Sequence, residues 1–593
     1  MLLSIRGLQH AAGTKTLFQD LSFAISKGDK IGLNGHNGCG KSTLLKILAG
    51  TVSADEGELS RRSGLRLAMV EQFVPENLLP MTLEEAVQRQ LPETERAGEG
   101  YRAGLMLGRL GFGDEDFALK VGDLSGGQLN RLMLARALVA EPDLVLLDEP
   151  SNHMDLATLS LLERFLAEEI DCAFLLVSHD RALLDAVTNR MLILRDRRLY
   201  AFEMPFSAAR QALMEMDIAA AAARADEEKK IARLRASAKR LAVWGKVYDN
   251  EKLARKAKTM ERRAARLEQA KTFVSSGSGL ALSLDARETR ANRMLLVEDL
   301  VVTPPGVPEV PLFRIDELVV RPGDRIALLG HNGCGKTSLI TRLLAAYTSA
   351  RESAQDGEHI RYSPQADVGY YDQALEAVDG RGGKTMLEYL RQETTVQETT
   401  LRNSLINAGC PYADHSRPVD VLSGGERARL RFLTLRLNRP NFLVMDEPTN
   451  HIDIDGREEL ETQLAESGAT LLMTSHDRRF IDNVATRFLL VEAGQLKELT
   501  DPEAFYGAMS QGDSAKVSAS KTTSDQPAEE QTMSAEDSTE GLREDEDVLL
   551  ERIVELEQLL ATDQARRPKF QKPKRQAAWR EELEALTRRL DGA

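Results

Sequence analysis

The chain contains the same series of motifs twice, and this internal repeat constrains its fold more than any other feature. The paired motifs are GHNGCGK at 35–41 and 330–336, LSGG at 124–127 and 422–425, DEP at 148–150 and 446–448, and SHDR at 178–181 and 475–478. All four offsets lie between 295 and 298 residues. Four motifs in one order at a nearly constant offset indicate two copies of one domain.

Each copy is typical of an α/β domain. Short apolar runs enter the glycine motif at 30–35 and 325–330, as a buried strand does before a turn. Further apolar runs end in acidic or polar residues at 144–150, 173–180, 442–448 and 470–477. Helical segments separate these runs, which predicts a largely parallel sheet covered by helices in each copy.

The glycine motifs match the phosphate-loop pattern GxxxxGK[ST]. Glycines let successive backbone N–H groups converge on phosphate oxygens at a helix N-terminus, while the lysine reaches the terminal phosphates and the hydroxyl ligates Mg²⁺. We therefore expect nucleotide contacts from Gly35, Asn37, Gly38, Cys39, Gly40, Lys41, Ser42 and Thr43, and from Gly330, Asn332, Gly333, Cys334, Gly335, Lys336, Thr337 and Ser338.

Acidic pairs follow one apolar run in each copy. Asp148 and Asp446 are expected to hold Mg²⁺ together with Ser42 and Thr337, and the next residues, Glu149 and Glu447, can polarise the attacking water. His179 and His476 follow the next run and are expected to contact the γ-phosphate. A serine with two glycines before a helix makes a second anion site, formed by Ser125, Gly126 and Gly127 and by Ser423, Gly424 and Gly425.

Together these motifs resemble the ATP-binding-cassette ATPases over about residues 1–205 and 290–505. The resemblance implies that two cassettes meet head to tail and enclose two ATP molecules, so that each phosphate loop faces the LSGG motif of the other copy. It also implies that Gln72 and Gln373 act as the glutamines that reach toward metal and water. The family's aromatic residue before the first glycine loop is replaced by HAAGTKT and TPPGVPE, which leaves both ATP and GTP open as substrates.

The composition differs between segments of the chain. We expect a first cassette at 1–205, a helical linker at 206–290, a second cassette at 291–507, a disordered acidic segment at 508–547 and a helical hairpin at 548–593. The linker lacks helix breakers until Gly245. Gly245 with Asp249 and Asn250 predicts a break, and the linker is expected to form two long helical arms, each of about 25–35 residues. The nearly equal intervals of 51 and 48 residues before the two LSGG motifs argue against a helical arm inserted in the first cassette.

The linker is strongly basic although the chain carries a net charge of −15. Residues 229–271 hold 15 Lys and Arg against 4 Asp and Glu, a bias that favours contact with an RNA phosphate lattice over a merely solvated helix pair. Two cassette motifs, SNHMD at 151–155 and TNHID at 449–453, resemble those of the ABC-F subfamily, and the linker resembles the linker of that subfamily. Members of this subfamily act on ribosomes. The expected nucleic-acid contacts are Arg240, Trp244, Lys246, Lys252, Arg255, Lys256, Lys258 and Arg262.

Several classes of protein are excluded or disfavoured by composition. No run of 18 apolar residues occurs, the first residues do not form a secretion signal, and the four cysteines include no CxxC pair. These features predict a cytoplasmic protein without a membrane segment, a disulfide framework or a zinc site. The expected pairing of the two cassettes within one chain predicts a monomer. We expect an ATP- and Mg²⁺-dependent ATPase that binds ribosomal RNA and tRNA in its closed, ATP-bound state.

Two alternatives remain open at this point. One is a tandem ATPase subunit of a membrane transporter, which would require membrane partners. The other is a DNA-binding ATPase that acts through the C-terminal hairpin, whose basic turn at 566–575 fits nucleic-acid contact and a solvated loop equally well.

Overall fold

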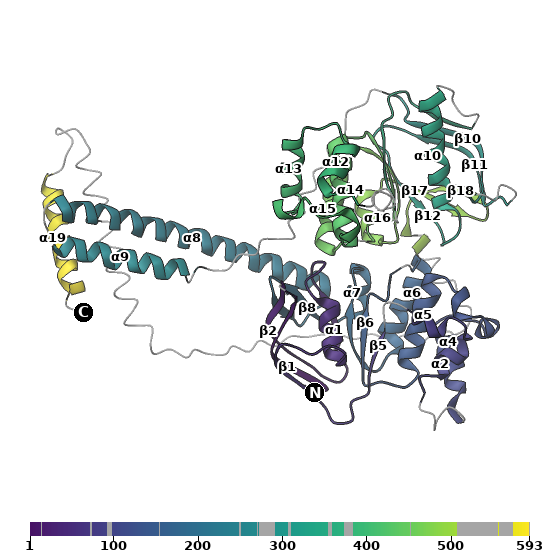
Figure 1. Cartoon of the computed structure of the whole chain (residues 1–593), viewed down its shortest axis with the longest axis horizontal. Coiled ribbons are helices and arrows are strands. Elements are labelled where there is room, and N and C mark those ends of the chain that lie inside the picture. The colour runs from purple at the N-terminus through teal and green to yellow at the C-terminus, as the bar shows by residue number, and fades with distance from the viewer. Residues whose placement is uncertain are drawn as a thin grey trace, which may run out of the picture. The chain divides into compact units, whose positions relative to one another are not determined.

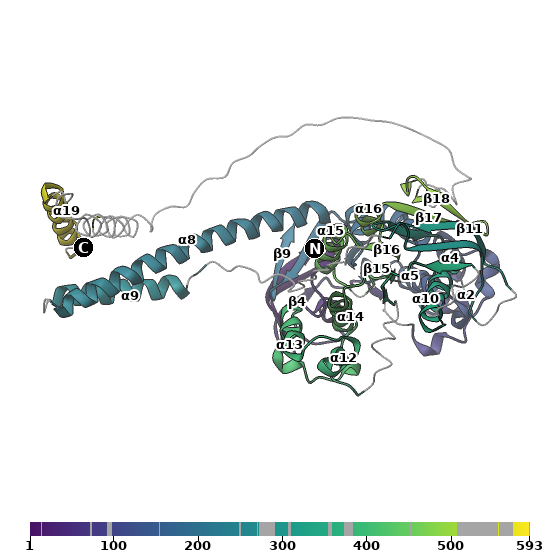
Figure 2. The same ribbon diagram turned by 90° about the horizontal axis from the view of Figure 1, so that it is seen from above.

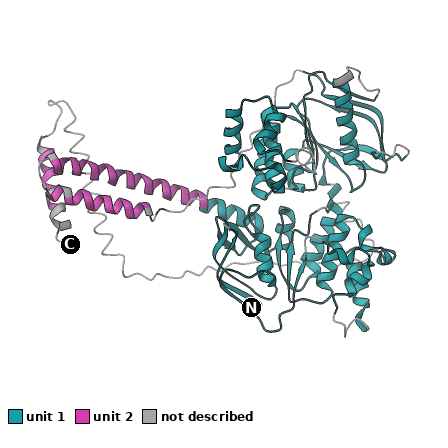
Figure 3. Cartoon of the chain, viewed as in Figure 1, with its two compact units in different colours: residues 1–216, 275–515 teal, residues 217–274, 516–593 magenta. Residues whose placement is uncertain are grey.

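The computed structural model describes the chain in two compact units, coloured separately in Figure 3. Unit 1 comprises residues 1–216 and 275–515, and unit 2 comprises residues 217–274 and 516–593. The structure describes all residues except 14, 71–73, 92–97, 153, 248–250, 270, 272–290, 306–309, 354–358, 373–382, 451, 504, 507–555, 557–572 and 592–593. The expected acidic segment and the basic turn at 566–575 therefore lie largely or wholly outside the described residues.

The first cassette is built on a six-stranded sheet in the order β5-β6-β7-β3-β8-β9 and a three-stranded antiparallel sheet in the order β2-β1-β4. The strands are β1 Leu3–Ala12, β2 Lys15–Ile25, β3 Lys30–Asn34, β4 Glu56–Arg61, β5 Leu67–Val70, β6 Leu144–Asp148, β7 Ala173–Val177, β8 Arg190–Arg195 and β9 Arg198–Phe202. The helices are α1 Lys41–Ala49, α2 Leu83–Gln88, α4 Tyr101–Arg109, α5 Gly126–Leu138, α6 Leu156–Arg164 and α7 Arg181–Val187.

The second cassette repeats this order in a single nine-stranded sheet, β13-β10-β11-β18-β17-β12-β16-β15-β14 (Figure 1). Its strands are β10 Leu295–Val302, β11 Phe313–Val320, β12 Arg325–Leu329, β13 Ile360–Tyr362, β14 Val368–Tyr371, β15 Phe442–Asp446, β16 Thr470–Thr474, β17 Arg487–Glu492 and β18 Gln495–Leu499. Its helices are α10 Lys336–Ser353, α12 Met386–Glu393, α13 Glu398–Asn407, α14 Gly424–Asn438, α15 Ile454–Glu466 and α16 Arg478–Val484.

The same backbone hydrogen bond joins the antiparallel strands to the main sheet in both cassettes. The N–H of Gln19 donates to Arg197 O at 2.9 Å, and the N–H of Arg314 donates to Gly494 O at 2.9 Å. In the first cassette the two parts are assigned as separate sheets, whereas in the second the pairing of β11 with β18 makes them one continuous sheet. The repeat seen in the sequence is confirmed as a repeat of the fold.

The central strands carry the apolar runs and place the site. Every residue of β6, β7, β15 and β16 is buried, as expected for parallel strands covered by helices on both faces. β3 pairs in parallel with β7 and β8, and β12 pairs in parallel with β16 and β17. The carboxyl ends of parallel strands share one edge of a sheet, where ligands of open α/β sheets bind.

Two short helices precede the LSGG helix in each copy. These are α2 and α4 before α5, and α12 and α13 before α14. Within the described parts of these segments neither copy contains a long inserted helix, in agreement with the similar lengths of the two intervals.

Unit 2 contains a helical hairpin formed by most of α8, Phe206–Val247, and by α9, Glu251–Gln269, which Figure 2 shows from above. α8 has 42 residues and passes through Gly245, so the first arm is longer than the sequence predicts. Apolar contacts join the helices through two clusters, Ala238, Leu241, Ala257 and Met260 in one and Ile231, Leu234 and Ala264 in the other. α19, Pro573–Asp591, also belongs to this unit.

None of the helices in the described part of the chain combines the length and the hydropathy needed to span a bilayer.

Candidate functional site

The first glycine loop connects β3 to α1. Gly40, the N-cap of α1, has a φ of 104°, a conformation that favours glycine, and a Cβ there would lie 3.2 Å from atoms of Leu17 and Phe18. The ammonium group of Lys41 donates to Gly35 O at 2.6 Å and is nearly buried. The loop thus presents its backbone N–H groups and one lysine at the start of a helix, which is the arrangement that binds phosphate.

The second loop repeats this geometry between β12 and α10. Gly335 has a φ of 107°, and a Cβ there would lie 2.8 Å from Leu312 Cδ1. The Lys336 ammonium donates to Gly330 O at 2.7 Å and to His331 O at 3.0 Å. The remaining predicted nucleotide contacts lie in the two loops or in the first turns of α1 and α10: Asn37, Gly38, Cys39, Ser42, Thr43, Asn332, Gly333, Cys334, Thr337 and Ser338.

Asp148 and Asp446 end the strands β6 and β15. Asp148 Oδ1 is buried and has no hydrogen-bond partner, and burial raises the pKa of this carboxyl although the Ser42 hydroxyl bonds to it. Asp446 Oδ1 accepts from the Thr474 hydroxyl at 2.6 Å. An unsatisfied carboxylate oxygen beside a hydroxyl is the donor set that suits Mg²⁺ when phosphate oxygens complete the shell, so the residues at the first loop fit this ion.

The glutamates that follow these aspartates adopt a left-handed backbone conformation, with φ of 50° at Glu149 and 48° at Glu447. Such a conformation is costly for a residue with a side chain and clusters at functional sites. Burial raises the pKa of Glu149 to about 7, against the opposing effect of the Lys41 and Arg457 charges. Glu149 is thus a carboxylate that can accept a proton near neutral pH.

Each histidine lies against the glutamate of its own cassette. The N–H of His179 donates to Glu149 Oε2 at 3.2 Å, and its Nε2 is 3.4 Å from Oε1. The corresponding distances from His476 to Glu447 are 3.3 and 3.5 Å. Burial lowers the pKa of His179 well below its ordinary value, with a smaller contribution from Lys41, so its imidazole is neutral.

The LSGG motifs begin helices in both copies. Ser125 and Ser423 are the N-caps of α5 and α14. The serine hydroxyl accepts a hydrogen bond from the backbone N–H of Gln128 or Glu426, respectively. The side chain of that residue in turn accepts a hydrogen bond from the backbone N–H of the serine. This reciprocal capping fixes the glycines at the first turn of each helix.

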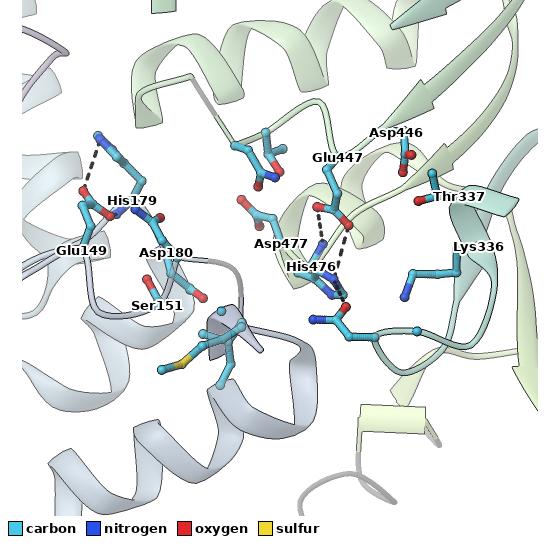
Figure 4. A pocket seen from close by; sticks show the side chains of 18 of the residues that line it. Glu149, Ser151, His179, Asp180, Lys336, Thr337, Asp446, Glu447, His476 and Asp477 are labelled. Carbon is cyan, nitrogen blue, oxygen red and sulfur yellow. Dashed lines mark hydrogen bonds and ion pairs between the residues drawn. The ribbon is translucent and has the colours of Figure 1, made fainter. Parts of the chain in front are cut away.

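The two cassettes of unit 1 meet head to tail. Gly126 lines one cavity of about 490 Å³ together with Lys336 and Thr337, and Gly425 lines a smaller one with Asn37. Figure 4 shows the larger cavity, with Lys336, Thr337 and Asp446 on one side and Glu149 and His179 on the other. Each glycine loop therefore lies near the LSGG motif of the opposite copy.

The aspartates that end the SNHMD and TNHID motifs, Asp155 and Asp453, tie the cassettes together. Asp453 Oδ2 accepts from the Asn37 N–H at 3.0 Å, and Asp155 Oδ2 accepts from the Asn332 N–H at 3.4 Å. Their other oxygens cap α15 and α6 by accepting from Gly456 and Thr158 at 3.0 Å. The N-cap role could have been found from the position of each aspartate before a helix, whereas the contact with the opposite loop could not.

Gln72 and Gln373 lie outside the described residues. Among the described residues, no group of three or more His, Cys, Asp and Glu side chains is placed to bind a metal ion.

The predicted nucleic-acid residues lie on the hairpin of unit 2. The Trp244 side chain is 43% exposed, and Lys246, Lys252, Arg255, Lys258 and Arg262 are exposed, while Arg240 and Lys256 are half-buried. The apolar clusters occupy the face between α8 and α9, so the charged side chains gather on the outer faces of the hairpin. The hairpin thus presents cations and one accessible indole.

The chain is similar to tandem ATP-binding proteins along most of its length. The ABC transporter family model matches residues 18–152 and 314–450. The ATP-binding protein Uup of Caulobacter vibrioides is 33% identical, with 83% of this chain and 77% of Uup covered. The ribosome protection protein VmlR of Bacillus subtilis is 28% identical, with 84% and 88% covered. The solved structure of RNase-L Inhibitor has a TM-score of 0.56 at 18% identity, covering 85% of this chain and 93% of that one, which shows a shared fold.

Proposed function

Because the chain belongs to the ABC-F subfamily of ATP-binding-cassette ATPases, we propose that it binds the ribosome while its cassettes are closed on ATP and leaves after hydrolysis. The protein is an ATP hydrolase of this family. In the proposed cycle the basic hairpin contacts tRNA or ribosomal RNA near the peptidyl-transferase region. The proposed site of action is the cytoplasm.

The first ATP site is proposed to combine Lys41, Ser42, Asp148, Glu149 and His179 with the LSGG motif at 422–425. The second is proposed to combine Lys336, Thr337, Asp446, Glu447 and His476 with the motif at 124–127. The aspartates with Ser42 and Thr337 would hold Mg²⁺, which neutralises charge on the transferred phosphoryl group when it is bound. Glu149 and Glu447 orient the attacking water and accept its proton.

The proposal of ribosome binding rests most directly on the hairpin. Its outer faces carry the exposed Arg255 and Lys258 and the accessible Trp244, in a segment whose charge of +11 contrasts with the acidic remainder of the chain. Cations bind the phosphate lattice of RNA, and an indole stacks on an unpaired base. The name of VmlR, a ribosome protection protein similar over most of this chain, supports the same partner.

The test reverses charge on the hairpin. A variant with Arg255→Glu, Lys256→Glu and Lys258→Glu should bind ribosomes more weakly, and the slope of log K against log salt should fall by roughly 2–3 because about three phosphate contacts are lost. Binding is measured by sedimentation across a salt series, and ATPase activity without ribosomes should stay at the wild-type level.

The matched control reverses three exposed cations of the first cassette, Lys27, Arg109 and Lys120, and changes the net charge by the same amount. Equal weakening by both triple variants would indicate a general charge effect and would remove the hairpin from the proposal. An unchanged salt slope in the hairpin variant would do the same.

A further inference from the structure

Arg457 of α15 lies at the centre of the cassette interface and is nearly buried. Its Nε donates to Ile452 O at 3.1 Å, which fixes the side chain against the start of its own helix. Its Nη1 donates to Asp477 Oδ2 at 3.0 Å, in the loop that carries His476. The same Nη1 donates across the interface to the backbone carbonyl of His179 at 2.9 Å.

The contact with His179 bears on the first ATP site. His179 is the residue whose N–H donates to Glu149 Oε2 and whose Nε2 lies 3.4 Å from Glu149 Oε1. The guanidinium of Arg457 therefore binds the carbonyl of the same residue whose N–H is bonded to Glu149. Because Arg457 is anchored at two points in its own cassette, it constrains where the His179 loop can lie.

The repeat is not symmetric at this position. LSGG and DEP recur at an offset of 298 residues, and the same offset places Leu159 opposite Arg457 in the first cassette. Leu159 lines the same cavity as Arg457, but a leucine side chain cannot donate a hydrogen bond to the loop of His476. Leu159 therefore cannot give the His476 loop the hydrogen bond that Arg457 gives the His179 loop.

We propose that Arg457 is a positioning residue for the first ATP site: from the opposite cassette, its side chain holds the His179 loop against Glu149. For this reason the two sites hydrolyse ATP at unequal rates. This inference rests on the proposed catalytic roles of Glu149 and His179. It assigns a function to a side chain outside the phosphate loop, LSGG and DEP motifs.

The experiment separates the two sites in the full-length chain. Glu447→Gln leaves turnover to the first site, and Glu149→Gln leaves it to the second. Into each background we introduce Arg457→Leu, the residue of the other copy, and Arg457→Lys, which retains a cation and a donor.

With only the first site active, Arg457→Leu should lower kcat by about tenfold and change KM for ATP by less than about twofold, since geometry at the reacting group is lost while the phosphate loop is intact. Arg457→Lys should recover part of kcat. With only the second site active, the loss of kcat should stay within about threefold.

An equal loss of kcat in both backgrounds, together with a lower Tm, would indicate a purely structural role and would overturn the inference. So would an unchanged kcat at the first site, or a rise in KM that accounts for the whole effect. If Glu149→Gln alone did not lower turnover, the proposed catalytic role of Glu149 would fail, and this result is distinguishable because it does not involve Arg457.

Discussion

Asp453 of the second cassette accepts a hydrogen bond from the backbone N–H of Asn37, in the glycine loop of the first cassette, at 3.0 Å. The two residues are separated by 416 positions in the chain. The same carboxylate caps α15 through its other oxygen. The glycine loop of one cassette is therefore held by a helix terminus of the other.

Asp453→Asn should weaken this link. An amide has one acceptor oxygen, so it can cap α15 or accept from Asn37 but cannot do both, and the loss of a hydrogen bond to a charged group costs about 1.5–3 kcal/mol. We expect a lower Tm and a higher ATP concentration for half-maximal turnover. The control is Asp155→Asn, whose bond to Asn332 is longer at 3.4 Å, and which should have the smaller effect. The opposite order of effects would contradict the account.

A buried ion pair also crosses the interface. Arg181 of α7 bonds to both carboxylate oxygens of Glu461 on α15, and both side chains are less than 9% exposed. Arg181→Ala leaves Glu461 buried without a cation and with only the hydrogen bond from Asn483 Nδ2 at 2.8 Å among those described. Breaking a buried ion pair in this way costs about 3–5 kcal/mol. The Tm of the full chain should fall clearly.

The control is the equivalent ion pair in which the second cassette supplies the arginine and the first cassette supplies the glutamate. Arg478 lies 3.5 Å from Glu163, and these side chains are 25% and 31% exposed. Arg478→Ala should therefore have a smaller effect on Tm, because a solvated pair contributes about 0–1 kcal/mol. Similar losses from the two variants would show that burial does not set the strength of these contacts.

Asp180 carries a charge that the interface disfavours. Burial and the nearby Asp477 raise the pKa of Asp180, against the effects of the Leu183 N–H, Arg457 and Arg478. A carboxyl whose pKa is raised by folding lowers stability when it is ionised. This cost is complete above the pKa of the folded state and vanishes as the pH falls below the ordinary aspartate value of about 3.9.

Asp180→Asn should therefore raise Tm at pH 8 and should retain the cap on α7, since asparagine also caps helices well. The difference in Tm from wild type should shrink as the pH is lowered toward the ordinary aspartate value of about 3.9. Asp171→Asn, at an exposed position, is the control and should leave Tm unchanged at both pH values. A difference that grows on acidification would have the wrong sign for this explanation.

The sequence predicted the elements that depend on local pattern. The strands before both glycine loops and before Asp148 and Asp446 are confirmed, because a buried parallel strand requires an apolar run that is visible in one segment. The helical linker and its break near Gly245, Asp249 and Asn250 are also confirmed, because α8 ends at Val247 and α9 begins at Glu251. Gly245 itself still belongs to α8. A single glycine costs only about 1 kcal/mol in a helix, which the contacts of Leu241 and its neighbours can offset.

Arg457 could not be identified from the sequence. The motifs stand out in the sequence because both copies contain the same residues. The position that holds Arg457 in the second copy holds Leu159 in the first, so it belongs to no repeated motif. Its role depends on a contact with His179, 278 residues earlier, that only the paired cassettes create. Residues that break the pseudo-symmetry are thus among those for which the structure was needed, together with contacts between the cassettes such as that of Asp453 with Asn37.

The central claim is that the ATP-bound, closed protein binds ribosomes. The most direct measurement is sedimentation of the Glu149→Gln/Glu447→Gln protein with purified ribosomes in ATP or in ADP. We predict pelleting that requires ATP and, with about ten phosphate contacts, an affinity that falls roughly 10³–10⁵-fold between about 50 and 200 mM salt. No pelleting at low salt in either nucleotide would contradict the account.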